Sequence, residues 1–168
     1  MRLETERLVL RSMEVEDIEA IIDLWTDPEV TRFLGGPREA GMVRDTSIED
    51  LAQPPAGPFG LWPLIEKSSD RFIGHCGLLD KEIDGAICVE LIYVLDRAAW
   101  GKGYATEIGL RLLDFAFDEL GLDRVVALVE PENLPSRLVA AKVGMRHEST
   151  LVRPGGAIRE LWSISRPG

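Results

Sequence analysis

Trp100-Gly101-Lys102-Gly103-Tyr104-Ala105-Thr106-Glu107 is the stretch on which the fold prediction depends. It joins an apolar segment, Ile87 to Leu95, to a periodic segment that runs from Tyr104 to Leu120. Two glycines therefore stand where a strand ends and a helix begins. Such a junction offers free backbone N–H groups and the positive end of a helix dipole to a phosphate. The stretch predicts a phosphate-binding turn, although the same glycines would also suit a plain tight connection.

Two familiar phosphate-binding motifs do not match this stretch. A dinucleotide fingerprint requires a third glycine three residues after the second, and Thr106 stands there. A P-loop requires Gly-Lys followed by Ser or Thr, but Gly103 follows Lys102. The turn is therefore of another kind, or it holds no ligand.

The segments after the glycines have clear periodicity. Apolar or small residues recur every four positions from Tyr104 to Leu120, which predicts an amphipathic helix that ends at Gly121. The apolar run 125–129 predicts a strand buried on both faces. Asn133 can cap a helix from Leu134 to Val143, and Gly144 ends it.

The remaining segments complete one mixed α+β domain, residues 1–168, with a mostly antiparallel sheet. We predict helices over 14–25, 28–33 and a polar stretch to about Leu51, with a Pro-rich loop at 53–58. We predict strands over 8–10, 59–66, 72–79, 87–95, 146–153 and 157–165.

Composition is that of a globular protein, with 45% hydrophobic and 29% charged residues. No apolar run approaches the ~20 residues of a membrane span, and the charged N-terminus does not resemble a signal peptide, so we expect a cytoplasmic protein without a membrane partner. The net charge of −10 disfavours nucleic acid as a partner. It suits a cationic amine substrate, or it serves solubility alone.

Cysteine and histidine usage argues against a metal site. The two cysteines, Cys76 and Cys88, lie in apolar segments without metal-ligand spacing, so we expect reduced, buried thiols. His75 and His147 are the only histidines, which leaves no histidine-rich cluster.

Four blocks of the sequence resemble one superfamily. They are 3–11 (LETERLVLR), 72–78 (FIGHCGL), 100–107 (WGKGYATE) and 133–144, and their order and spacing match the GNAT acyl-CoA-dependent N-acyltransferases. The closest resemblance is to the RimJ/RimL type, named for ribosomal-protein N-terminal acetyltransferases. It implies the GNAT fold, in which helices flank a mixed, mostly antiparallel sheet with a splayed strand pair. It also implies acetyl-CoA as the donor.

The resemblance also assigns residues to coenzyme A. The family's pyrophosphate motif, Gln or Arg, two residues, Gly, one residue, then Gly or Ala, maps onto Trp100, Gly103 and Ala105, with Trp100 departing from it. Asn133, Ser136 and Lys142 match the family's Asn-x-x-Ser-x5-Lys block, although Asn133 would also serve as a plain helix cap. The implied cofactor-binding residues are Tyr93, Val94, Leu95, Trp100, Gly101, Lys102, Gly103, Tyr104, Ala105, Thr106, Asn133, Ser136 and Lys142.

Acyl transfer to an amine requires groups that move protons. Glu90 interrupts the apolar run 87–95, where burial would raise its pKa, so it is the best base, acting directly or through water. A structural ion pair or an exposed strand face would explain it equally well, and His75 is the second candidate. Much of the family uses a Tyr as the acid, but Ala140 stands at that position. That leaves Ser136, which would equally well be a plain polar residue in the first turn of its helix. An N–H near Leu95 is the family's expected donor to the oxyanion.

The sequence therefore predicts an acetyl-CoA-dependent N-acetyltransferase that acts on a primary amine by direct transfer in a ternary complex. The acceptor is a protein N-terminus or a small-molecule amine, bound by the N-terminal helices, the 54–58 loop and the 153–157 turn. The alternative is a non-catalytic acyl-CoA-binding sensor or interaction module on the same fold. A homodimer is left open. A cysteine nucleophile is not expected.

Overall fold

The computed structural model describes every residue from Met1 to Gly168, and the chain divides into two compact units. The first unit comprises Met1–Gly77 and Tyr93–Tyr104, and the second comprises Leu78–Ile92 and Ala105–Gly168. Each unit is built from two separate pieces of the chain, so the backbone passes from one to the other three times.

Eight strands form a mixed, mostly antiparallel sheet, as predicted. The hydrogen-bonded order is β1-β2-β3-β4-β5-β6-β8-β7. The pairs β1/β2, β2/β3, β6/β8 and β7/β8 are antiparallel, whereas β5 and β6 are parallel. The strands are β1 (Arg2–Glu4), β2 (Leu8–Arg11), β3 (Gly60–Glu66), β4 (Arg71–Ile83), β5 (Ala86–Leu95), β6 (Arg124–Val129), β7 (Arg146–Val152) and β8 (Ile158–Ser165).

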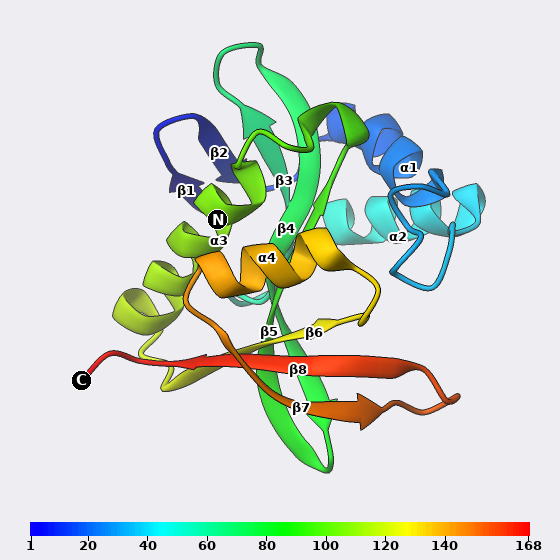
Figure 1. Cartoon of the computed structure of the whole chain (residues 1–168). Helices are drawn as coiled ribbons and strands as arrows, with labels where there is room; N and C mark the ends of the chain where they lie inside the picture. Colours follow the sequence, from blue (N-terminus) through cyan, green and yellow to red (C-terminus); the bar gives the residue numbers. More distant parts are fainter. The chain divides into compact units, whose positions relative to one another are not determined.

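The first unit carries two helices that lie side by side, α1 (Ile18–Thr26) and α2 (Ala40–Ala52) (Figure 1). Their exposed surfaces are joined by an ion pair between Arg44 and Glu19, with 2.6 Å between nitrogen and oxygen. The sheet beneath is closely packed at Gly77, where a Cβ would lie 1.9 Å from the Gly60 carbonyl oxygen. Only glycine fits that approach of two backbones.

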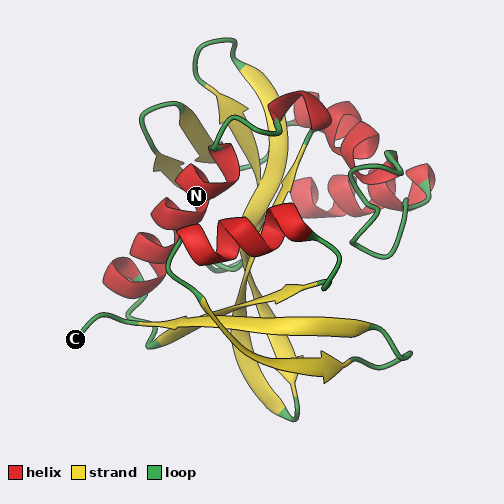
Figure 2. Ribbon diagram, in the orientation of Figure 1, coloured by secondary structure: helices red, strands yellow, loops and turns green.

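The second unit carries α3 (Tyr104–Asp114, apart from its first residue), a π-helical segment (Phe115–Glu119) and α4 (Leu134–Lys142). Figure 2 shows its long C-terminal hairpin, β7 and β8. Gly109 lets α3 approach the end of α4, because a Cβ there would lie 3.1 Å from Val143.

Outside α3, three helices or strands differ from the predictions. Residues 28–33 form hydrogen-bonded turns, so the predicted second helix is wrong. The Asp27 carboxylate accepts the N–H groups of Glu29 and Val30, and the Thr31 hydroxyl donates to the Asp27 carbonyl. These side-chain bonds satisfy the backbone locally in place of a helix. The other two differences are that β1 was not predicted and that β4 continues beyond Leu79 to Ile83.

Candidate functional site

The loop before α3 has the backbone that its glycines allow. Gly101 has φ 71° and Gly103 has φ 81°, both in the left-handed region that other residues rarely adopt. A Cβ at Gly101 would have no heavy atom within 4 Å. Both glycines and Lys102 are exposed, so the main chain is open to a ligand at the start of the helix. This arrangement fits a pyrophosphate that must approach backbone N–H groups.

Side chains of the first unit hold this loop in place. Arg7 donates to the Lys102 carbonyl at 3.0 Å, and its guanidinium lies 4.4 Å from the centre of the Tyr104 ring. The Tyr104 hydroxyl donates to the Glu66 carboxylate. Hydrogen bonds from Ser69 and Tyr104 lower the pKa of Glu66, which keeps it ionised. Arg7 and Glu66 were not predicted as site residues.

Trp100 has a role that the family motif did not suggest. Its indole N–H donates to the Leu95 carbonyl at 2.9 Å, while 48% of the residue remains exposed. The bond ties the end of β5 to the loop that follows it. Val94 and Leu95 are buried, and Tyr93 is half-buried. The indole therefore occupies the Leu95 carbonyl at the end of the strand.

Glu90 lies in the second unit and is only 7% exposed. Lys81 lies 3.9 Å from one carboxylate oxygen, and the Leu128 N–H lies 3.4 Å from the other. Burial raises the pKa of Glu90, and the effect outweighs Lys81, which lowers it. Glu90 pairs with Val126 in the β5/β6 ladder, and its carboxylate accepts a hydrogen bond from the N–H of Leu128, two residues further along β6. Glu90 is therefore a buried carboxyl group with one long ion pair and one long hydrogen bond.

Helix α4 begins as predicted. The Asn133 side-chain oxygen accepts the Ser136 backbone N–H at 3.2 Å, so Asn133 caps the helix. The group that Asn133 caps is the Ser136 backbone N–H. Ala140 is buried, and Lys142 is exposed in the last turn. The ligand contacts expected of Asn133, Ser136 and Lys142 stay predictions.

His75 and Cys76 are poor candidates for proton transfer or nucleophilic attack. Burial lowers the pKa of His75 to about 4, and its Nδ1 accepts the Trp25 indole N–H at 3.2 Å. Burial raises the pKa of the Cys76 thiol to about 12. His75 is therefore a neutral packing residue at pH 7, and Cys76 stays protonated. Both cysteines are free, but Cys88 is only half-buried.

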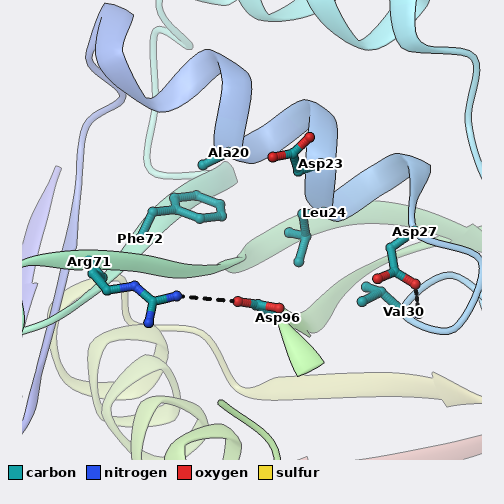
Figure 3. A pocket seen from close by; sticks show the side chains of 8 residues that line it. All are labelled: Ala20, Asp23, Leu24, Asp27, Val30, Arg71, Phe72 and Asp96. Carbon is teal, nitrogen blue, oxygen red and sulfur yellow. Dashed lines mark hydrogen bonds and ion pairs between the residues drawn. The ribbon is translucent and has the colours of Figure 1, made fainter. Parts of the chain in front are cut away.

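The first unit also contains a pocket of about 390 Å³ that was not predicted (Figure 3). Two of its three carboxylates have arginine partners, since Asp96 lies 3.8 Å from Arg71 and Asp27 lies 3.0 Å from Arg97. Asp23 is exposed and has no such partner. One carboxylate, that of Asp23, is therefore left without an arginine partner, which makes the pocket acidic. It is lined by Ala20, Asp23, Leu24, Asp27, Val30, Arg71, Phe72 and Asp96.

The predicted site residues are divided between the units. The first unit contains Tyr93–Tyr104, with the strand end and the glycine loop. The second contains Glu90, Ala105, Thr106 and α4. No group of three or more His, Cys, Asp or Glu side chains is placed to hold a metal ion. None of the helices has both the length and the apolar character needed to cross a membrane.

Comparison with known proteins decides the family. The family model described as an acetyltransferase (GNAT) domain matches residues 7–146. The chain belongs to the GNAT acetyltransferase family. The predicted enzyme class, an N-acetyltransferase, and the GNAT fold are thereby confirmed.

Individual relatives agree with this assignment. An uncharacterized N-acetyltransferase p20 of Bacillus licheniformis is 38% identical over 155 residues, 89% of this chain and 84% of the relative. The FsC-acetyl coenzyme A-N(2)-transacetylase of Aspergillus fumigatus is 41% identical over 159 residues, 88% of this chain and 66% of the relative. A GNAT-family acetyltransferase structure from Bacillus anthracis superposes with a TM-score of 0.83 at 26% identity and covers 98% of each chain.

Proposed function

We propose that this GNAT protein transfers an acetyl group from acetyl-CoA directly to a primary amine. The observation that carries the proposal is the open, left-handed backbone at Gly101 and Gly103 at the start of α3. The Aspergillus relative is named for acetyl coenzyme A and an N(2) acceptor, which supports the same donor. The RimJ/RimL type, a cytoplasmic location and a homodimer stay predictions.

The residues of the glycine loop fit the donor. Gly101, Gly103 and Ala105 would offer backbone N–H groups to the pyrophosphate, and exposed Lys102 would add positive charge. Tyr93, Val94 and Leu95 would present main-chain groups to the pantetheine arm in the manner of an added strand. When bound, the donor supplies a thioester whose acyl carbon is open to attack.

Glu90 is the proposed base. An amine of the lysine type has a pKa of ~10 and an α-amino group a pKa of ~8, so both are mostly protonated at neutral pH. Only the neutral amine has a lone pair. Glu90 accepts the proton directly or through a water molecule, and its raised pKa brings it nearer to that of the amine.

Two further groups complete the proposed chemistry. The Leu95 N–H stabilises the negative charge that develops on the acyl oxygen. Ser136 donates a proton to the departing thiolate, in place of the tyrosine that Ala140 replaces. Direct transfer agrees with Cys76, whose buried thiol has a pKa of about 12.

Thiol release from acetyl-CoA across a panel of amines tests the proposal. We expect turnover by the wild type and a loss of about 10²–10⁴-fold in Glu90→Gln and in Ser136→Ala, with binding of coenzyme A retained. Glu82→Gln, an exposed glutamate on the same β4–β5 hairpin as Glu90, is the matched control and should stay active. Coenzyme A binding without turnover of any amine would favour the non-catalytic sensor instead.

A further inference from the structure

One face of the second unit combines an apolar cluster with charged residues. Ile83, Val126 and Leu161 are buried together there. Cys88, Leu128 and Leu151 are partly buried against them. Alternate residues of a strand point to the same face, so the neighbours two positions away share this face with the cluster.

Four charged residues occupy such neighbouring positions. Lys81 is two residues from Ile83, Glu90 from Cys88, Arg153 from Leu151, and Arg159 from Leu161. The strand register agrees, because Arg159 lies opposite Leu151 in the β7/β8 pair. Arg153 stands just past the end of β7, where its N–H still bonds to the Ala157 carbonyl. Glu90 therefore shares its face with three cations from two hairpins.

The charges on this face do not cancel. Lys81 contacts Glu90 at 3.9 Å, and Arg159 contacts Glu130 at 3.6 Å. Arg153 makes no ion pair and is only partly exposed. Burial is the largest influence on the pKa of Glu90, but Arg153 and Arg159 both lie near enough to lower it. One positive charge is left over beside the proposed base.

We propose that the acceptor is an amine that carries a carboxylate in the same molecule, and that Arg153 receives this carboxylate. The inference rests on the proposed function, because it takes Glu90 as the place where the amine reacts. A guanidinium matches a carboxylate with two parallel hydrogen bonds. A polycationic acceptor would instead be repelled by Lys81, Arg153 and Arg159, the three cations that share a face with Glu90.

Matched acceptors test the inference in the full-length protein. Thiol release is measured with short peptides that have a free C-terminal carboxylate, with the same peptides as C-terminal amides, with free amino acids, and with a linear polyamine. We expect kcat/KM to be about tenfold or more higher for the carboxylates than for the amides, the size of one well-formed charged contact. In Arg153→Gln this ratio should fall towards one, mainly through KM. Arg146→Gln, an exposed arginine at the opposite end of β7, should keep the ratio.

The possible outcomes separate the two proposals. Equal or faster turnover of amides or the polyamine would overturn the carboxylate inference and leave the acetyltransferase proposal standing. A preference for the polyamine would favour the acidic pocket of the first unit as the place where the acceptor binds. A carboxylate preference that survives in Arg153→Gln would overturn the role of Arg153. The absence of thiol release with every acceptor would contradict both the proposed function and the inference that rests on it.

Discussion

At the scale of single residues, the pH dependence of stability can distinguish whether Glu90 is a base or a member of a structural ion pair. Burial raises its pKa above the ordinary 4.5, so the folded protein holds this proton more tightly than the unfolded chain. Stability from this group is present below pH 4.5 and is lost as the pH rises through the raised pKa. Glu90→Gln removes the ionisation, so at pH 7–8 the variant should be as stable as the wild type or more stable.

Chemical denaturation of both proteins between pH 4 and pH 8 measures this difference in unfolding free energy. We expect the advantage of Glu90→Gln to shrink as the pH falls towards 4.5. A variant that is instead clearly less stable at pH 8 would mean that attraction to Lys81, Arg153 and Arg159 outweighs burial. Glu90 would then be better explained as a structural ion-pair residue.

The close backbone contact at Gly77 leads to a second prediction about a single residue. A Cβ there would lie 1.9 Å from the Gly60 carbonyl oxygen, and a strand backbone cannot retreat without breaking its ladder. Gly77→Ala should lower the unfolding free energy by about 3 kcal/mol or more. Gly57→Ala is the control, since a Cβ there has no neighbour within 4 Å and φ is not positive. Urea denaturation should find Gly57→Ala within about 0.5 kcal/mol of the wild type, and a similar small effect at Gly77 would contradict the packing.

At the scale of elements, the glycine loop can be tested with two matched substitutions. Gly101 has φ 71° and Gly121 has φ 68°, and a Cβ at either position would have no neighbour within 4 Å. Alanine should therefore cost each about 1–2 kcal/mol of unfolding free energy through backbone strain alone. Calorimetric titration with coenzyme A should find weakened binding only in Gly101→Ala. Equal affinities in the two variants would argue against pyrophosphate binding at the loop.

Periodicity predicted most elements, and the failures have physical causes. Strand β1 is only Arg2–Glu4, and its single inward side chain, Leu3, leaves no alternation to detect. The α3 segment changes to a π-helix over Phe115–Glu119. The repeat from Tyr104 to Leu120 predicted a plain helix, but the π-helix fits it, since each four-residue step exceeds one full turn of an ideal α-helix by about 40°. A π-helix has more residues per turn, so it reduces this angular excess.

The sequence could indicate only part of the candidate site, and the contacts that it did not indicate share one property. Gly101, Gly103, Asn133 and Glu90 stand out through local backbone geometry or a break in an apolar run, and both features are readable in the sequence. Arg7 reaches Lys102 from a position 95 residues away, and Trp100 caps a carbonyl in the preceding strand. The positive charge of Lys81 and Arg153 beside Glu90 depends on strand register between hairpins. Such contacts need the fold before they can be found.

At the scale of the whole molecule, the negative net charge of the chain differs in sign from the local charge around Glu90. The chain has 29 acidic and 19 basic residues, which suggested a cationic substrate or mere solubility. Lys81, Arg153 and Arg159 nevertheless give Glu90 a positive surrounding. Charge at this range is set by a few residues, while the overall balance governs solubility and long-range attraction. We therefore expect acceptor specificity to depend on the local charges of the hairpins.

The single domain predicted from the sequence can be tested by unfolding, because the tryptophans are unevenly distributed. Trp25, Trp62 and Trp100 belong to the first unit, and Trp162 belongs to the second. In Trp162→Phe, fluorescence reports the first unit alone, while far-UV circular dichroism reports both. The chain passes between the units three times, so neither can be removed by one cut, and we expect the two urea transitions to coincide. A fluorescence midpoint distinct from the dichroism midpoint would mean that the units unfold separately and that the chain is two domains.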